Sequence, residues 1–431
     1  MTMGLFFSIL AIILAIGTPV AVLFGGMSFL PSMLDSSFPY SMEYAIRSML
    51  GGLDSFTLLA VPLFMLSGII MAKGGISDKL FNFFAYFIGN KTAGFPIAVI
   101  GTCMFYGAIS GSSPATVSAV GTMTIPFLVS MGYEKVFSTA MVTVAGGLGV
   151  IIPPSISYIV YAAAASTSPS QLFIGGIIPG VLIGLSLMVY AYIHCRIHGE
   201  DKELLLAKYK KIRAKGFLPL LKDSIWALIT PVIILGSIYG GIASPTEAAA
   251  ISVVYSLFVS LFVYRTFKIC DLWSVFREGS RTYVTILFII AAATAFGRVI
   301  TLLRFPQEIS SLLIGNISNA VVILILLNMI LLVCGMILDN IPNIMILTPI
   351  FLPIAKSIGM DPIHFGIMLS ANLAIGMVTP PMGINLYVAS SMTDIPVLQI
   401  SRATIPFLVA FFISLVLIAF VPQLSLYLPS L

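Results

Sequence analysis

The chain alternates long apolar runs with short interruptions that are polar or rich in glycine and proline. The main apolar runs are 5–24, 96–109, 172–192, 248–263, 320–338 and 405–421. A helix that crosses the hydrocarbon core of a bilayer needs about 20 such residues, and some of these runs are too short to cross alone. We therefore expect an all-α polytopic membrane protein with broken and re-entrant helices. Run 5–24 has no basic residue before it and no small-residue cleavage site, so we expect a retained span and not a secretory signal.

The interruptions recur in two halves of the chain. At a spacing of 227, matching prolines and glycines are Pro126 and Pro353, Gly132 and Gly359, Gly149 and Gly376, Pro153-Pro154 and Pro380-Pro381, Pro169 and Pro396, and Pro179 and Pro406. Earlier in each half the spacing is 226, which relates Pro19 to Pro245 and Gly89-Asn90 to Gly315-Asn316. We predict a first repeat at 1–198, a linker at 199–217 and a second repeat at 218–431, each with scaffold and transport elements.

A doubled membrane chain with interrupted hydrophobic segments at matching places is typical of secondary transporters. If each half crosses the membrane an odd number of times, the second copy is inverted. Two inverted repeats would then bring their interruptions to the membrane midplane from opposite sides.

Composition supports residence in lipid, since 59% of the residues are hydrophobic and only 9% are charged, against about 25% charged in soluble domains. The linker region carries 8 of the 21 lysines and arginines: Arg196, Lys202, Lys208, Lys210, Lys211, Arg213, Lys215 and Lys222. The positive-inside rule places this region in the cytoplasm. The net charge of +5 lies in loops and not on a surface with interleaved aromatic residues, so nucleic acid is excluded as a partner.

The first polar interruption of each half predicts a re-entrant hairpin. Segment 107–116 reads GAISGSSPAT, and its counterpart 339–343 reads DNIPN, with Asp339 and Asn340 opposite Ser112 and Ser113. Irregular backbone at membrane depth must be buried in protein or line a wet cavity. An acid such as Asp339 within apolar sequence is a functional candidate, and sodium, a hard cation, suits oxygen ligands. The alternatives are a small-residue packing site for the first segment and an interfacial position for Asp339.

The second interruption of each half is a diproline, in 149–155 and in 376–383. Paired prolines open a helix, free carbonyl oxygens for a cation and aim the next helix N-terminus at the gap, where an anionic group could bind. A simple kink is the alternative. Five side chains that follow these openings could line a substrate cavity or form an interfacial belt: Ser157, Tyr158, Tyr161, Asn385 and Tyr387.

Two further segments have less specific patterns. His194, Cys195 and His198 have metal-like spacing, but a helix end at the lipid headgroups is the more ordinary interpretation. Segment 41–52 is amphipathic, which suits a helix that lies along the interface, and its counterpart 268–281 carries more charge.

Four longer motifs resemble those of one transporter family. They are GAISGSSPATVSAVGTMTIP at 107–126, IIPPSISYIVY at 151–161, NLAIGMVTPPMGINLYVASS at 372–391 and GGIIPG at 175–180. Together they resemble the large membrane subunit (M subunit) of the tripartite ATP-independent periplasmic (TRAP) transporters of the bacterial inner membrane. The resemblance implies sodium-driven uptake of an organic acid anion, such as a C4-dicarboxylate or sialic acid, by an elevator mechanism. It also implies a small membrane subunit and a periplasmic substrate-binding protein as partners.

The resemblance also assigns site residues. One sodium ion would bind at Ser110, Ser112, Gly149 and Ile152. A second would bind at Asp339, Asn340, Gly376, Thr379 and Met382, largely through backbone oxygens. Substrate would lie between them, near Ser112, Ser113, Thr116 and Asn385.

The nearest alternative is a stand-alone ion-coupled carboxylate symporter of similar design. An enzyme is disfavoured because the sequence has no HExxH helix, no GxSxG elbow and no second membrane aspartate to pair with Asp339. An ATP-driven pump is disfavoured because no GxxxxGK[ST] loop is present.

Overall fold

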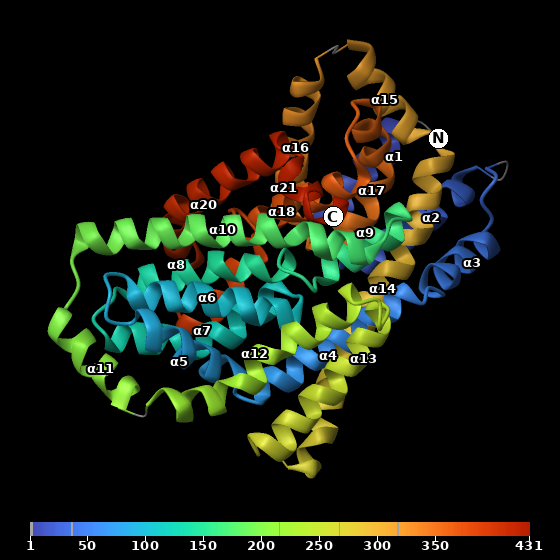
Figure 1. Cartoon of the computed structure of the whole chain (residues 1–431). Coiled ribbons are helices and arrows are strands. Elements are labelled where there is room, and N and C mark those ends of the chain that lie inside the picture. Colours follow the sequence, from blue (N-terminus) through green and yellow to red (C-terminus); the bar gives the residue numbers. More distant parts are fainter. Residues whose placement is uncertain (1–2, 36–37, 215, 267, 317–318) are drawn as a thin grey trace.

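The computed structural model describes residues 3–35, 38–214, 216–266, 268–316 and 319–431, and within these ranges it contains helices and no strand. Figure 1 shows the helices and their labels. Their bounds are α1 Met3–Ala15, α2 Val20–Leu34, α3 Met42–Leu53, α4 Ala60–Lys73, α5 Ile76–Ile88, α6 Gly94–Ser110, α7 Ser113–Ser130, α8 Lys135–Ala145, α9 Ile156–Ala165, α10 Pro169–His198, α11 Lys202–Ala214, α12 Phe217–Tyr239, α13 Pro245–Phe258, α14 Leu272–Leu302, α15 Phe305–Asn316, α16 Ala320–Ile337, α17 Asn340–Ser357, α18 Pro362–Gly376, α19 Ile384–Thr393, α20 Val397–Phe420 and α21 Gln423–Leu426.

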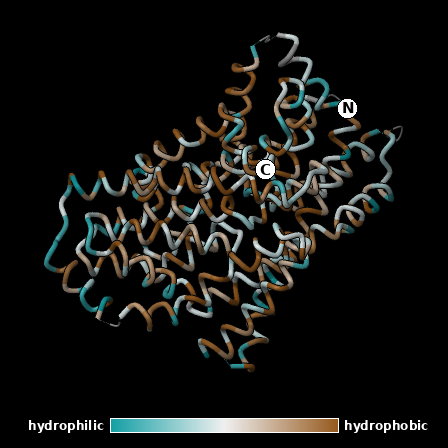
Figure 2. Tube along the Cα trace, viewed as in Figure 1, coloured by the Kyte–Doolittle hydropathy of each residue, from teal (hydrophilic) through white to brown (hydrophobic). Residues whose placement is uncertain are grey.

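Six helices in the described residues are long and apolar enough to cross a membrane, or seven spans if the bent pair α3 and α4 counts as one. The α-helical, polytopic architecture expected from the apolar runs is therefore confirmed. Figure 2 shows hydrophobic residues along most of the helices, with hydrophilic residues concentrated at their ends and around α11. That distribution matches helices in lipid with polar connections in water.

One expected span is wrong. Run 5–24 does not form a single helix, because α1 ends at Ala15 and α2 begins at Val20. Between them Gly17 has a φ of +85°, a left-handed conformation that glycine adopts readily. Pro19 lies directly before the first residue of α2. Its fixed φ and its missing N–H are tolerated at the start of a helix but not in its interior, so the chain starts a new helix here.

Helix bounds recur at nearly the spacing of the sequence repeat. Adding 227 to the bounds of α7, Ser113–Ser130, gives those of α17, Asn340–Ser357. The same addition relates the last residues of α6 and α16 and the first residues of α8 and α18. The halves differ near their starts. In the first half α3 and α4 meet at 64°. In the second half the single helix α14 takes the place of both, and its first part, 272–281, carries Arg277, Glu278 and Arg281.

The two halves interlock. Helix α4 packs on α13, α2 on α14, and α8 and α10 on α20. The hydroxyl of Ser67 in α4 donates to the Ser252 carbonyl of α13 (3.2 Å), and Tyr40 donates to the Ala295 carbonyl of α14 (3.1 Å). Hydrogen bonds and small residues at helix contacts are the usual means of association inside lipid. The division of the chain at 198 and 218 stays a prediction.

Candidate functional site

The first hairpin consists of α6 and α7, and its tip is short and polar. Helix α6 ends at Ser110, Gly111 turns the chain with a φ of +61°, and Ser112 precedes α7, whose second residue is Pro114. Glycine in this conformation ends a helix, and proline in the first turn starts one. The Ser110 and Thr116 hydroxyls lie 3.1 Å apart, and Thr116 donates to the Ser112 carbonyl at 2.8 Å.

The first break lies between α8 and α9. Helix α8 tightens into a 3-10 segment at Gly146–Val150, after which the chain bends through a cis Pro153-Pro154 bond and restarts at Ile156. The Ser155 hydroxyl donates to the Val150 carbonyl (2.6 Å), and the Ile156 amide donates to the Gly111 carbonyl (3.3 Å). The opened helix is thus joined to the tip of the first hairpin.

Glycines make this approach possible. A Cβ atom on Gly149 would lie 2.5 Å from the Thr116 hydroxyl and 2.7 Å from the Ser112 carbonyl oxygen, and a Cβ on Gly107 would lie 2.7 Å from the Gly149 Cα. All three separations are shorter than a Cβ atom can adopt, so glycine at both positions lets the break touch the tip.

The first predicted sodium group is therefore largely gathered in space. Ser110, Ser112 and Gly149 lie together, and their neighbours are hydroxyl and carbonyl oxygens, the ligands that a hard monovalent cation prefers. Ile152 lies in the same bend, where its side chain packs against Gly180 of α10.

The second hairpin consists of α16 and α17, with its tip at Asp339. The Asp339 carboxylate accepts the amide of Asn340 at 2.8 Å at the start of α17. The Asn343 side chain donates to the carbonyls of Leu338 and Cys334, at 3.0 and 3.1 Å. The Asn343 side chain thereby donates to carbonyls at the end of α16, where the last carbonyls of a helix have no hydrogen-bond donor within the helix itself.

The second break, between α18 and α19, approaches the second hairpin in the same manner as in the first half. A Cβ on Gly376 would lie 2.5 Å from the carbonyl carbon of Gly335 in α16. The Thr379 hydroxyl donates to the Ile375 carbonyl (2.6 Å), while Met382 is 52% exposed. The close approach at Gly376 thus joins this break to α16, whereas the predicted members Asp339 and Asn340 lie at the start of α17.

Each hairpin is bonded to the restarted helix of the other half. Asn385 in α19 donates to the Ser113 hydroxyl (2.6 Å) and to the Thr143 carbonyl (3.3 Å). Asn340 in α17 donates to the Ser157 hydroxyl of α9 (3.2 Å). The side-chain oxygens of both asparagines are buried and have no protein partner among the described residues. A buried amide oxygen without a partner is costly, which marks both positions as candidate ligand positions.

A second pair of contacts also crosses between the halves. The Lys135 ammonium at the start of α8 donates to the Thr393 carbonyl at the end of α19 (2.6 Å). The Tyr161 hydroxyl of α9 donates to the Pro362 carbonyl at the start of α18 (2.6 Å). The two hairpins and the two broken helices are thus tied into one body.

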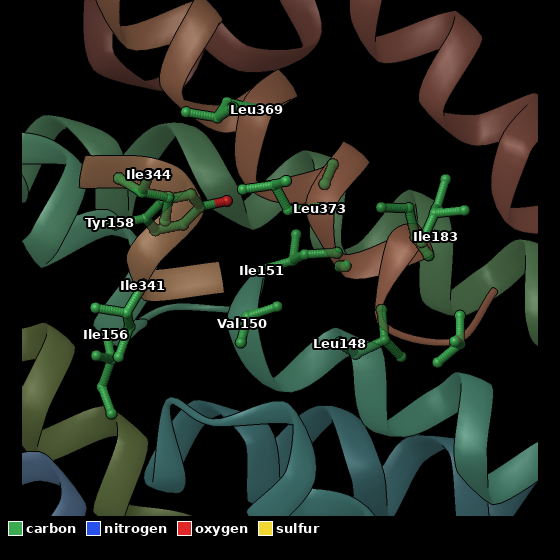
Figure 3. Close-up of a cluster of buried hydrophobic side chains, with 14 of the residues drawn as sticks. Leu148, Val150, Ile151, Ile156, Tyr158, Ile183, Ile341, Ile344, Leu369 and Leu373 are labelled. Carbon is green, nitrogen blue, oxygen red and sulfur yellow. The ribbon is translucent and has the colours of Figure 1, made fainter. Parts of the chain in front are cut away.

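Figure 3 shows the apolar side of this junction, where Ile341 and Ile344 of α17 lie beside Ile156 and Tyr158 of α9. Tyr158 and Tyr161, which follow the first break, are fully buried, whereas Tyr387, which follows the second break, is 52% exposed. The sequence named all three tyrosines as cavity candidates, and two of them, Tyr158 and Tyr161, lie in the interior.

A cavity of about 410 Å³ lies beside the first hairpin tip. It is lined by α4, the hairpin, α14 and the second hairpin's aspartate, including Gly68, Tyr106, Ser110, Ser112, Thr282 and Asp339. The predicted residues Ser110, Ser112 and Asp339 therefore share one cavity.

The lining of this cavity includes one basic side chain, Lys73, and two acidic side chains, Glu278 and Asp339. Lys73 at the end of α4 forms a 2.6 Å ion pair with Glu278 of α14, and Asp339 is the second acid. This pair was missed in the sequence, because the partners belong to different halves and no local pattern relates them. With all three groups charged, the lining carries a net negative charge.

The histidine cluster forms no metal site. Among the described residues, no group of three histidine, cysteine or acidic side chains could hold a metal ion. His194 instead stacks on Phe137 and on His198, with ring centroids 4.0 Å apart in both cases. These contacts agree with the interpretation of this segment as a helix end.

Glu200 connects this helix end to the hairpin side of the molecule. Its carboxylate accepts the Ala93 amide at 3.0 and 3.1 Å and the Tyr133 hydroxyl at 2.5 Å. Burial raises the pKa of Tyr133, and Glu200 raises it further, so the phenol stays protonated and donates. The start of the linker is thereby fixed to the loops that precede α6 and α8.

Comparison with known proteins gives a consistent result. The family described as "Tripartite ATP-independent periplasmic transporter, DctM component" matches residues 7–424. The chain is 38% identical over 98% of its length to the isethionate TRAP transporter permease protein DctMQ of Oleidesulfovibrio alaskensis, of which it spans 65%. It is 41% identical over 88% of its length to the C4-dicarboxylate TRAP transporter large permease protein DctM of Pseudomonas aeruginosa, of which it spans 87%.

A solved structure, that of Neisseria gonorrhoeae MtrF, has the same fold. Its TM-score is 0.63 at 14% sequence identity, with 95% of this chain and 94% of that chain covered. At this identity the likeness concerns the fold alone.

Proposed function

Because the chain belongs to the DctM family of large permease components of TRAP transporters, and is a multi-pass protein of the bacterial inner membrane, we propose that it carries an organic acid anion inward together with sodium ions. The substrate comes from a periplasmic binding protein, and a small membrane subunit completes the complex. The protein acts as a transporter and not as an enzyme.

The observation that carries this proposal is the pairing of each polar hairpin tip with a broken helix. At the first pair, two hydroxyls and a carbonyl lie against a glycine that no larger residue could replace. At the second, a carboxylate and two asparagines stand at the tip. Oxygen-rich sites of this kind at the repeat interface suit sodium as a co-transported substrate.

The charge of the cavity supports coupling between cation and anion. Two acids and one base repel an anion, and each sodium ion that binds nearby adds a positive charge. We infer that sodium binds before the acid, and that Lys73 becomes available to the anion as Glu278 is neutralised or displaced. Asn385 and Ser113 supply neutral hydrogen-bonding groups beside the same tip.

For the motion, we propose an elevator in which the two repeats are inverted. The hairpins and broken helices α6–α9 and α16–α19 move together, because hydrogen bonds cross between them in both directions. Helices α2, α3, α4, α12, α13 and α14 form the scaffold, held together by contacts such as Ser67 to Ser252.

The names of the relatives suggest which class of substrate the protein carries. One relative is named for isethionate and another for C4-dicarboxylate. Sialic acid is a third candidate, since a further relative is named for it. The common chemistry is a small organic anion.

The test is counter-flow in liposomes with labelled organic acids, using the chain with its small subunit and binding protein. We expect uptake of at least one acid, and we expect it to require sodium. Uptake that is equal without sodium would reject the coupling. Uptake by the chain alone would favour the stand-alone symporter.

A further inference from the structure

A basic cleft lies on the outside of the helix bundle and shares no lining residue with the cavity beside the first hairpin tip. It has a volume of about 280 Å³ and is formed by α5, α11 and α12. Three lysines line it, Lys79 from α5 and Lys208 and Lys211 from α11, with Asp223 of α12 as the only acid among the described lining residues. We call these residues the basic cleft.

The charges of the basic cleft do not cancel. Lys79 is paired with Asp223 at 3.4 Å, with the aspartate 61% exposed. Lys208 lies over the ring of Phe127, 5.3 Å from its centroid, which holds the ammonium in place without neutralising it. Two positive charges therefore remain to attract an anion.

Apolar residues adjoin the lysines. Ile212, Pro219 and Leu220 line the cleft, and Leu218 at the start of α12 is 79% exposed. Helix α12 is one of the candidate membrane spans. The cleft thus lies where this span meets the linker, which the positive-inside rule places in the cytoplasm. At such a span end we expect lipid headgroups beside the lysines and acyl chains beside the exposed apolar surface.

The cleft is built by packed elements. The Ser224 hydroxyl of α12 donates to the Lys79 carbonyl of α5 at 3.0 Å. In α11, Leu205, Tyr209 and Ile212 are buried, and this helix packs on α5. The lysine positions are therefore fixed relative to one another.

We propose that the basic cleft binds the headgroup phosphate of one anionic phospholipid of the cytoplasmic leaflet, whose acyl chains lie along the exposed start of α12. Basic pockets between membrane helices on this side recognise such headgroups. The lipid joins α11 to α5 and α12 and so anchors the linker between the two halves. This inference does not depend on the transported substrate.

The test is native mass spectrometry of the full chain in detergent, titrated with phosphatidylglycerol and, separately, with phosphatidylcholine. We expect one phosphatidylglycerol to bind in preference to phosphatidylcholine. Replacing Lys208→Gln and Lys211→Gln together should weaken phosphatidylglycerol binding by about tenfold or more, since each lysine near a membrane surface contributes to anion binding. The same variant should lose the rise in thermal unfolding temperature that the lipid causes.

The matched control is Lys210→Gln with Lys222→Gln, which removes the same charge from exposed positions of the same region that do not line the cleft. This variant should keep the bound lipid. Equal losses in the two double variants would show a diffuse attraction and overturn the proposal, as would a normal affinity in the Lys208 and Lys211 variant. Displacement of the lipid by equimolar glycerol phosphate would also overturn it, because a free phosphate site needs no membrane.

Discussion

At the scale of single residues, Asp339 is the carboxylate on which the proposed ion coupling most depends. Replacing Asp339→Asn keeps the size of the side chain but removes its charge. We expect the sodium concentration for half-maximal uptake to rise by about tenfold or more, the usual effect of losing one charged ligand interaction. Sodium titration of uptake measures it, and Glu43→Gln, at a 73% exposed carboxylate in α3, is the control. An unchanged sodium requirement in Asp339→Asn would argue against the ion assignment.

Gly149 gives a steric test at the same scale. Its Cβ would overlap the Thr116 hydroxyl and the Ser112 carbonyl, so Gly149→Ala must push the break away from the hairpin tip. We expect a loss of about 1–3 kcal/mol of stability, as in other overpacked interiors, with a larger loss of sodium-dependent uptake. Gly25→Ala, where a Cβ meets no atom within 4 Å, should lower neither, since alanine favours a helix interior over glycine. Normal uptake in Gly149→Ala would remove this glycine from the site.

At the scale of elements, the bonds between hairpins and restarted helices determine whether the site elements act as a unit. Asn385→Leu removes the donor to Ser113 and to the Thr143 carbonyl. We expect about 1–3 kcal/mol of destabilisation from the groups left unpaired, together with a raised KM for the acid. Asn328→Leu, a polar change between α16 and α18 outside the tip, should destabilise the protein without changing KM. A KM that changes equally in both variants would contradict a specific role for Asn385.

The sequence predicted the turns and helix breaks that are set by single residues or by adjacent residues in the chain. Gly111 and the diprolines dictate a turn and two breaks by backbone chemistry alone, and the helices begin and end where they require. Run 5–24 was misread because hydropathy does not register the turn at Gly17. The bonds from Asn385 to Ser113 and from Asn340 to Ser157 join residues 272 and 183 positions apart, so only packing of the whole chain reveals them.

At the scale of the whole molecule, the proposed elevator requires the hairpin body to slide past the scaffold. Ser118 in α7 and Thr282 in α14 line the same cavity from opposite bodies. Cysteines at both positions, joined by a short bifunctional reagent in a background without native cysteines, should abolish uptake. Cysteines at Ser67 and Ser256, whose hydroxyls lie 2.8 Å apart within the scaffold, should leave uptake intact when joined. Full uptake with the first pair cross-linked would exclude the motion.

The central claim is that paired discontinuities in the two halves bind cations that enter the cell with an acid. Simultaneous measurement of radioactive sodium and labelled acid in the same proteoliposomes, with the complete transporter, tests it most directly. The account predicts sodium uptake that begins with acid uptake, in a fixed ratio of at least one ion per acid, and a lower ratio in Asp339→Asn. Acid that accumulates with no accompanying sodium would contradict it.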